Sequence, residues 1–512
     1  KMANKTKVGF ISLGCSKNLC DTEIMLKHLL DAGYEITPEE TEADIVIVNT
    51  CAFIESAKKE SIDNIIDVGW LKKHHKLKGI IVTGCLAERY KDEVLKEMPE
   101  VDALLGVGSI HKIVEAVQSI EANFGKKDYP KYTCFEDKES SVIGGERLLT
   151  TGDSMAYIKI AEGCNNRCTY CAIPLIRGKM RSRTMKDIIE EATSLDALGV
   201  KELNIIAQDT SAYGIDLYGK YELPELIRGI CDATNIPWIR LLYCYPDKIT
   251  DELVAEIRDN PRVVKYIDIP IQHISDRVLK AMNRHGDSAL IRDAVKRLRE
   301  IPGIVLRSTA IVGFPGETEE DFEELCKFIK EAKFERFGAF TYSREEDTPA
   351  YDFPNQVDEQ IKTKRSEVLI KQGEELMKAY RQNFINKKIS TVKPSGIRKF
   401  FDIANEMDDV ISLSIGEPDF QTPWHIREEG INSLKKGKTW YSPNRGFAEL
   451  REEIAAYYKR RFGIEYDAKK QTLVTVGGSE AIDLVFRTLL DPGDEVIIPE
   501  PSFVCYGPLT VM

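Results

Sequence analysis

Residues 162–174 read EGCNNRCTYCAIP and carry three cysteines in the spacing CxxxCxxC, namely Cys164, Cys168 and Cys171. A structural zinc site needs four ligands, which usually arrive as two close pairs. Because no fourth cysteine stands near these three, zinc would require a further ligand from a distant part of the chain. Three thiolates alone indicate a metal centre that keeps one coordination position open.

The sequence around this motif, residues 154–386, alternates strand and helix patterns. Runs rich in β-branched residues predict six strands, within 155–163, 202–209, 238–246, 264–272, 305–316 and 336–343. Amphipathic stretches between them predict helices, so we expect the strands to run parallel. Six such units are too few for a complete eight-unit barrel and favour a partial (βα)6 TIM-like barrel. The cysteine motif follows the first strand, on the face where barrels carry their active sites.

A second strand–helix block covers residues 5–125 and predicts a flavodoxin-like domain with a parallel sheet covered on both faces. Three of its Val- and Ile-rich strand patterns end in a cysteine: Cys15, Cys51 and Cys85. Cysteine is a common buried residue, so a single one would mean little. Ligands of open α/β sheets bind outside the carboxyl ends of the strands, and three cysteines at equivalent positions therefore indicate a second site.

The bulk composition limits the classes of protein that this chain can represent. A length of 512 residues is enough for about three domains, and a net charge of −12 disfavours a globally basic nucleic-acid-binding surface. Twelve cysteines are too sparse for a disulfide scaffold. No signal peptide or membrane-spanning segment is recognisable, so we expect a cytoplasmic protein without a membrane partner. Residues 126–153 are polar and turn-rich and predict a linker.

The stretch CNNRCTYC resembles the signature of the radical S-adenosylmethionine enzymes. The resemblance implies a 4Fe-4S cluster on its three cysteines, with an open iron that chelates S-adenosylmethionine and cleaves it to a 5′-deoxyadenosyl radical. It also implies contacts to S-adenosylmethionine from Gln272 and Arg284, and we expect Gln208 and Asp209 to face the same cofactor. A solvated charge at a helix end is the alternative for Arg284. The basic run RGKMRSR, residues 177–183, is expected either to bind an acidic substrate or cofactor carboxylate or to form a solvated loop.

The two cysteine triads together are similar to the methylthiotransferase subfamily, which inserts a methylthio group into a C–H bond. This resemblance implies a second 4Fe-4S cluster on Cys15, Cys51 and Cys85 that carries the transferred sulfur. Over residues 5–386, the motifs SLGCSKN, GCLAERY, AQDTSAYG and RSTAIVGFPGETEEDF resemble the branch that modifies the β-carbon of an aspartate in ribosomal protein S12. An electron donor such as flavodoxin or ferredoxin is implied as a partner, and the sulfur donor stays open.

The last block, residues 391–512, resembles the beginning of a class I/II aminotransferase of the pyridoxal-phosphate fold type I. In that family a glycine-rich turn, here residues 477–481, binds the cofactor phosphate at a helix N-terminus. The Schiff-base lysine motif is not found in this sequence, so we expect neither bound pyridoxal phosphate nor transaminase activity. The block stands where the methylthiotransferases continue into a TRAM domain, and we expect an incomplete fragment joined by a truncated or fused reading frame.

Three alternatives to the ribosomal-protein assignment stay open. The first is a transfer-RNA adenosine methylthiotransferase, which would perform the same chemistry on nucleic acid and show salt-dependent binding. The second is a pyridoxal-phosphate aminotransferase, which the missing lysine disfavours. The third is a non-catalytic iron–sulfur binding module, which would not cleave S-adenosylmethionine.

Overall fold

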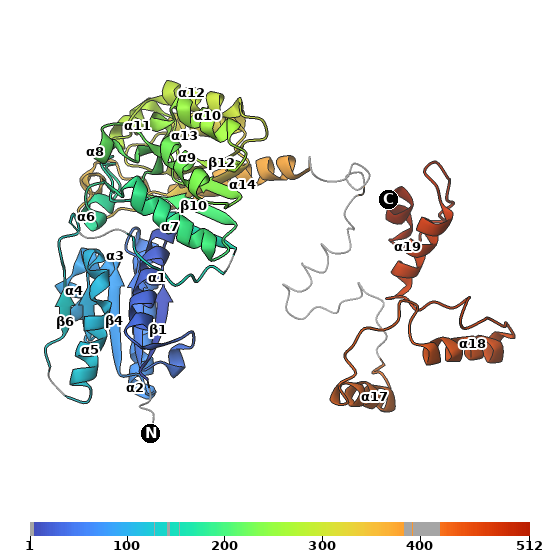
Figure 1. The fold of residues 1–512 in the computed structure, drawn as a ribbon. Coiled ribbons are helices and arrows are strands. Elements are labelled where there is room, and N and C mark those ends of the chain that lie inside the picture. The colour runs from blue at the N-terminus through green and yellow to red at the C-terminus, as the bar shows by residue number, and fades with distance from the viewer. Residues whose placement is uncertain (1–4, 127–128, 141–143, 153, 383–391, 393–419) are drawn as a thin grey trace. The chain divides into compact units, whose positions relative to one another are not determined.

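The computed structural model describes residues 5–126, 129–140, 144–152, 154–382, 392 and 420–512. The chain divides into two compact units, Lys1–Tyr380 and Arg381–Met512 (Figure 1). The predicted start of the aminotransferase-like block at residue 391 lies outside the described residues.

The first domain of the larger unit is built on a six-stranded parallel sheet with the strand order β2-β1-β3-β4-β5-β6. Its strands are β1 (Lys7–Ser12), β2 (Glu35–Thr37), β3 (Ile45–Thr50), β4 (Gly79–Gly84), β5 (Ala103–Leu105) and β6 (Tyr132–Cys134). Every residue of β3 and β4 is buried, as expected for central strands of Val and Ile that are covered on both faces. The predicted flavodoxin-like sheet is therefore confirmed.

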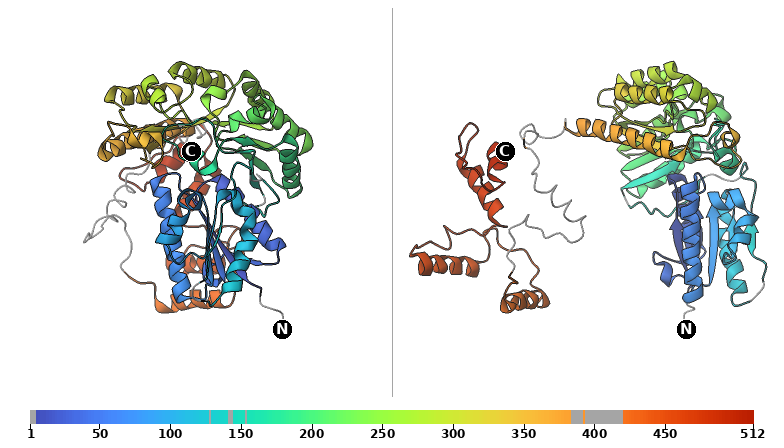
Figure 2. Two further views of the ribbon diagram at one scale, coloured as in Figure 1. Left: turned by 90° about the vertical axis from the view of Figure 1, so that its left-hand side faces the viewer. Right: turned by 180° about the vertical axis from the view of Figure 1, so that it is seen from behind.

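Helices cover both faces of this sheet and give it two separate hydrophobic cores (Figure 2, left). One core contains side chains of α1 (Ser16–Asp31) and α5 (Ile113–Asn123). The other contains side chains of α2 (Glu55–His74), α3 (Cys85–Tyr90) and α4 (Asp92–Glu97). Burial of the sheet from two sides leaves its carboxyl edge as the place where connecting loops gather.

The segment predicted as a linker contributes one element to the sheet. Residues Tyr132–Cys134 form β6, which pairs in parallel with β5 at the sheet edge. Three residues carry too little periodicity to be recognised as a strand among polar, turn-rich neighbours. Cys134 is therefore a residue of the sheet.

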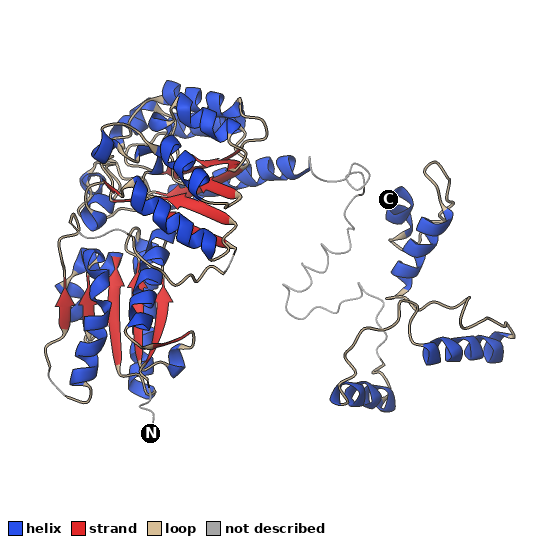
Figure 3. Ribbon diagram, in the orientation of Figure 1, coloured by secondary structure: helices blue, strands red, loops and turns tan. Residues whose placement is uncertain are grey.

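The second domain is built on another six-stranded sheet, with the order β14-β13-β12-β11-β10-β7 and parallel pairing throughout (Figure 3). Its strands are β7 (Met155–Lys159), β10 (Glu202–Ile206), β11 (Trp238–Leu241), β12 (Val263–Asp268), β13 (Val305–Val312) and β14 (Arg336–Thr341). The strands of this sheet lie side by side in the order in which they occur in the chain, and β7 and β14 lie at its two edges. The six predicted strands and the partial, open barrel are confirmed.

Helices connect these strands, as in other parallel α/β sheets. They include α7 (Met185–Ala197), α9 (Leu223–Ala233), α10 (Asp251–Asp259), α12 (Ser288–Arg299) and α13 (Glu319–Ala332), and α14 (Glu359–Gln382) follows the last strand. One contiguous apolar core joins the inner faces of these helices to the sheet. Within the described residues, no helix is both long and apolar enough to cross a membrane.

The smaller unit is described over residues 420–512, where it contains four helices and no strand. The helices are α17 (Trp424–Lys435), α18 (Ala448–Phe462), α19 (Gly478–Leu489) and α20 (Tyr506–Val511). The predicted glycine-rich turn is present, since Gly477 precedes α19 with a φ of +83°. No residue between 420 and 512 is buried, so these four helices share no buried hydrophobic core within the described residues.

Candidate functional site

The structure brings the cysteines of the first triad to one edge of the first sheet. Cys15 follows β1 and caps α1, Cys51 follows β3 directly, and Cys85 follows β4 as the first residue of α3. These three strands are adjacent in the sheet. Burial, and repulsion from the thiolates of Cys51 and Cys15, raise the pKa of the Cys85 thiol to about 12, although the nearby Arg177 guanidinium acts to lower it.

The side chain of Asn18 forms hydrogen bonds to the loops that carry this triad. Its amide nitrogen donates to the carbonyl oxygens of Leu13 and Thr50, both at 2.9 Å, and so joins the loop before Cys15 to the end of β3. Its backbone oxygen accepts a hydrogen bond from Asn49 at 2.8 Å. The Asn18 side chain is completely buried, so it holds these backbone groups without competition from water.

The second triad lies in the loop between β8 (Ala161–Glu162) and α6 (Ile173–Arg177). Backbone hydrogen bonds fix this loop: the Cys164 nitrogen donates to Gly178 O at 3.2 Å and the Thr169 nitrogen donates to Met282 O at 3.0 Å. Asn283 also donates to Arg167 O at 2.9 Å. The loop follows the first barrel strand, at the carboxyl end of the sheet, as predicted.

The residues of both triads suit an iron–sulfur cluster better than a single ion. Within the described part of the chain, no three ligand side chains converge closely enough to bind one metal ion. Polar donors surround the sulfurs: Asn166 Nδ2 lies 3.5 Å from Cys164 Sγ, and Arg284 Nη1 lies 3.9 Å from Cys168 Sγ. Burial raises the pKa of Cys164 to about 11, so a bound metal centre is what would stabilise its thiolate. Four of the six cysteines are buried, and together with these hydrogen-bond donors they fit two clusters with three protein ligands each.

Gln208 and Asp209 follow β10 and lie beside the second triad. Asp209 is buried and accepts hydrogen bonds from Asn166 at 2.7 Å and Ser211 at 2.7 Å, while Lys248 Nζ lies 3.1 Å away. Gln208 donates to Glu162 Oε1 at 2.5 Å, and its own Oε1 is buried without a protein partner. Of the polar atoms of Gln208 and Asp209, Gln208 Oε1 is therefore the acceptor that a bound ligand would satisfy.

Arg284 and Gln272 have different surroundings. Arg284 is only 8% exposed, so the solvated alternative is wrong. Its Nη2 donates to Pro270 O at 2.7 Å, and its guanidinium lies 4.1 Å from the ring centre of Tyr245. Gln272 is partly buried, has a φ of +66° and is held by backbone hydrogen bonds to Thr309 and Ile311. Whether these residues contact S-adenosylmethionine stays a prediction.

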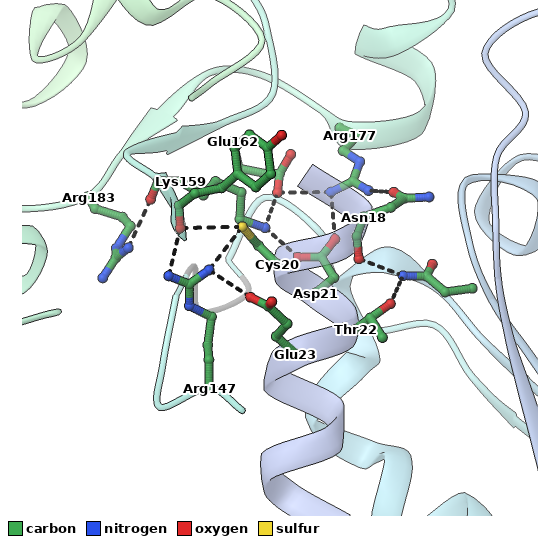
Figure 4. A network of polar contacts seen from close by, with 12 residues as sticks. Asn18, Cys20, Asp21, Thr22, Glu23, Arg147, Lys159, Glu162, Arg177 and Arg183 are labelled. Atoms are coloured by element: carbon green, nitrogen blue, oxygen red, sulfur yellow. Dashed lines mark hydrogen bonds and ion pairs between the residues drawn. The ribbon is translucent and has the colours of Figure 1, made fainter. Parts of the chain in front are cut away.

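A buried network of ion pairs joins α1 of the first domain to the barrel domain (Figure 4). Lys159 Nζ lies 2.5 Å from Asp21 Oδ1 and 2.7 Å from Glu162 Oε2. Arg177 Nη1 lies 2.9 Å from Asp21 Oδ2 and 3.0 Å from Glu162 Oε2. Asp21 belongs to α1, which follows Cys15, and Glu162 stands two positions before Cys164. The network therefore ties the surroundings of one triad to those of the other.

The expectation for the basic run 177–183 is wrong for two of its arginines. Arg177 and Arg183 are neither solvated nor directed at a substrate, because both are buried. Arg183 pairs with Glu191 at 2.5 Å and Asp187 at 2.7 Å. The carboxylates that pair with Arg177 and Arg183 belong to other helices and strands. The residues of the run itself therefore do not indicate that these two arginines are buried in ion pairs. Sequence reasoning likewise missed Asn18, Asp21, Lys159 and Glu162, although SKN beside Cys15 was part of a recognised motif.

Comparisons with known proteins agree with this arrangement. The family models that match are "Uncharacterized protein family UPF0004" over residues 7–106, "Radical SAM superfamily" over 158–329 and "Aminotransferase class I and II" over 408–509. A radical S-adenosylmethionine methyltransferase, TsrM from Kitasatospora setae, is 14% identical, covers 66% of this chain and 73% of its own, and has a TM-score of 0.48. The radical SAM family model and the CxxxCxxC triad that lies within it define a radical S-adenosylmethionine enzyme, and the N-terminal domain adds a second cysteine triad.

Curated relatives specify the family. The ribosomal protein uS12 methylthiotransferase RimO of Thermoanaerobacter sp. (strain X514) is 50% identical over 385 residues, which cover 75% of this chain and 87% of the relative. The protein of the same name from Clostridium botulinum (strain Eklund 17B / Type B) is 51% identical over 425 residues, or 81% of this chain and 94% of the relative. The chain belongs to the ribosomal protein uS12 methylthiotransferase RimO family.

Proposed function

We propose that this enzyme adds a methylthio group to the β-carbon of an aspartate in ribosomal protein uS12. One observation carries the proposal: two cysteine triads, with four of their six cysteines buried, lie at the carboxyl ends of two parallel sheets within one compact unit. The chain is 50% identical over 385 residues to a protein named as a ribosomal protein uS12 methylthiotransferase. A radical enzyme that only abstracts hydrogen needs one cluster. A second triad provides a place to hold the sulfur that is transferred.

The residues have separate roles in this proposal. Cys164, Cys168 and Cys171 would hold the cluster that binds S-adenosylmethionine, and Cys15, Cys51 and Cys85 would hold the auxiliary cluster. When bound, the clusters and S-adenosylmethionine supply the organic radical, the methyl group and the sulfur. The protein's part is to orient these groups, and Arg284, Gln272, Gln208 and Asp209 are proposed to bind S-adenosylmethionine.

The proposed chemistry also defines partners and location. Reduction of the cluster requires an electron donor, for which a flavodoxin or ferredoxin is suited, and a sulfur donor must restore the transferred atom. A ribosomal substrate and oxygen-sensitive clusters are expected together in the cytoplasm. No role in catalysis is proposed for the aminotransferase-like residues 420–512, whose helices bury no side chain.

A product assay tests the proposal. The clusters are reconstituted without oxygen, and reductant, S-adenosylmethionine and sulfide are added. Ribosomal protein uS12 and bulk transfer RNA are offered in parallel, and both are examined by mass spectrometry. We expect a methylthio mass gain on one uS12 aspartate and none on transfer RNA.

Two triple alanine variants provide the controls. Replacement of Cys164, Cys168 and Cys171 should abolish formation of 5′-deoxyadenosine. Replacement of Cys15, Cys51 and Cys85 should preserve it while abolishing the mass gain. Modified transfer RNA would replace the proposed substrate with the nucleic-acid alternative, and a wild-type enzyme that forms no 5′-deoxyadenosine would contradict radical catalysis.

A further inference from the structure

Arg177 of the barrel domain contacts the auxiliary triad, which consists of Cys15, Cys51 and Cys85. It ends α6, the helix that follows Cys171, yet its Nη2 lies 3.7 Å from Cys85 Sγ in the other domain. The same Nη2 donates to Asn18 Oδ1 at 2.5 Å. The side chain is only 3% exposed, so water screens its charge poorly.

The geometry around Arg177 keeps the guanidinium in place beside the sulfur. Its other terminal nitrogen, Nη1, is bound by Asp21 at 2.9 Å and Glu162 at 3.0 Å. A guanidinium presents its donors in a rigid plane, so bonds on one side fix where the other side points. Lys159 shares the same two carboxylates, and the two cations and two anions of the network balance each other.

We propose that Arg177 is a positioning residue for the auxiliary cluster, which it orients through Cys85 and whose reduction potential it raises. The proposal rests on the proposed function, because it requires a cluster on Cys15, Cys51 and Cys85. A cluster gains one negative charge on reduction, and hydrogen bonds to its sulfurs are among the factors that set its potential. A buried cationic donor at one sulfur therefore favours the reduced state.

Substitution of Asp21 should shift the reduction potential of the auxiliary cluster in the direction opposite to substitution of Arg177. Removal of the Arg177 charge leaves a net negative network beside Cys85, which should disfavour reduction. Removal of the Asp21 charge leaves a net positive network, which should favour it. Simple damage to the interface would not shift the potential in opposite directions for the two variants.

The test measures the auxiliary cluster alone in the full-length chain. Cys164, Cys168 and Cys171 are replaced by alanine so that one cluster remains, and iron content is expected at about four per chain. The midpoint potential is then determined by anaerobic titration with dithionite, followed by electron paramagnetic resonance. Arg177→Met, Arg177→Lys and Asp21→Asn are compared with the control Arg147→Met. Arg147 is equally buried and lies 3.1 Å from the sulfur of Cys20, which belongs to neither triad.

At the midpoint of the unsubstituted protein, we expect Arg177→Met to lower the ratio of reduced to oxidised cluster about tenfold, equivalent to about 59 mV for one electron. Arg177→Lys should shift the ratio less, since it keeps the charge, and Asp21→Asn should raise it. Equal shifts in Arg177→Met and Arg147→Met would overturn the proposal. If Arg177→Met retains no cluster, Arg177→Lys and Asp21→Asn decide by the direction of their shifts. A chain that binds no iron on the first triad would refute the cluster assignment itself, whereas bound iron with an unchanged potential refutes only the role of Arg177.

Discussion

Lys159 at the end of β7 forms a buried ion pair with Asp21 of α1, although 138 positions separate them in the sequence. Both side chains are 5% exposed. Removing one partner of a buried pair leaves an uncompensated charge in a medium that solvates it poorly. The pair therefore holds the two domains in one arrangement.

Substitution of Lys159 tests this coupling. We expect Lys159→Met to lower the free energy of unfolding of the cluster-free protein by about 3 kcal/mol. The double variant with Asp21→Asn should lose less than the sum of the single variants, with a coupling of about 1–3 kcal/mol. Urea unfolding followed by circular dichroism measures both. Lys186→Met is the control, because Lys186 is 86% exposed in its pair with Glu190 and should change stability by less than about 0.5 kcal/mol. Additive losses would contradict a direct interaction.

Asn18 should be essential for the auxiliary site. Asn18→Leu removes the donors to Leu13 O and Thr50 O and leaves buried carbonyl groups unpaired, at a cost of about 2–3 kcal/mol. We also expect iron content after reconstitution to fall towards half, since the lost backbone contacts support the loops that carry Cys15 and Cys51. Asn64→Leu is the control, because the Asn64 amide makes an exposed bond within α2. Full iron content in Asn18→Leu would show that the cysteines are positioned by other contacts.

Substitution of two glycines, each directly before a proposed ligand cysteine, should affect the two proposed cluster sites separately. Gly84 has a φ of +91°, and an added Cβ would lie 2.5 Å from Thr50 O; Gly163 has a φ of +78°, and its Cβ would lie 2.7 Å from Gly178 O. Gly84→Ala and Gly163→Ala should each cost about 3 kcal/mol. The first should deplete the auxiliary cluster and the second should abolish S-adenosylmethionine cleavage.

Gly199 provides the control for these variants. Its φ is also +91°, but an added Cβ would meet nothing within 4 Å. Gly199→Ala should cost only the backbone strain of about 1–2 kcal/mol and leave both clusters in place. Iron analysis and formation of 5′-deoxyadenosine measure the outcomes, and equal iron loss in all three variants would exclude a local effect.

Asp321 should make the stability of the barrel depend on pH in the acidic range. Burial alone would raise the pKa of Asp321, but hydrogen bonds from Ser275, Thr318 and Arg277 hold it at about 2. A depressed folded-state pKa contributes stability that is complete above the unfolded value near 3.8 and is lost as pH falls towards 2.

Asp321→Asn should therefore lower stability by about 1–2 kcal/mol at pH 7, and its difference from the unsubstituted chain should shrink as pH falls from 5 to 2. Thermal unfolding of cluster-free protein measures this difference. Asp251→Asn is the control, because Asp251 also lies in the first turn of its helix but is 94% exposed. A difference that stays constant with pH would argue against an ionised Asp321.

The aminotransferase-like residues should be dispensable for the stability of the larger unit. Because residues 420–512 contain no buried side chain, a chain that ends at Gln382 loses no described core residue. We expect its melting temperature and iron content to match those of the full chain. A chain that ends at Asp358 is the contrasting control, since it loses α14 with the fully buried Leu369 and the 2.6 Å pair between Arg365 and Glu317. A destabilised chain ending at Gln382 would show that the removed residues support the enzyme.

Much of the fold could be predicted because its signals are local. Runs of β-branched residues identified the six barrel strands, and amphipathic spacing identified the helices between them. Cys15, Cys51 and Cys85 follow strands, and a parallel sheet necessarily brings such positions to one edge. By contrast, β6 is only three residues long, and its pairing with β5 depends on a neighbour that is distant in sequence.

The sequence by itself determined the parallel α/β architecture, the two cysteine triads and the family, since these depend on residue type and spacing along the chain. Only the tertiary structure decided that Arg177 and Lys159 are buried, and that they bind Asp21 and Glu162 between the triads. An arginine in a basic run has the same local pattern whether it is solvated or buried. The environment of Arg177 is set by Asp21 from the N-terminal domain and by Glu162 from its own domain, and this arrangement is complete only when the two domains pack.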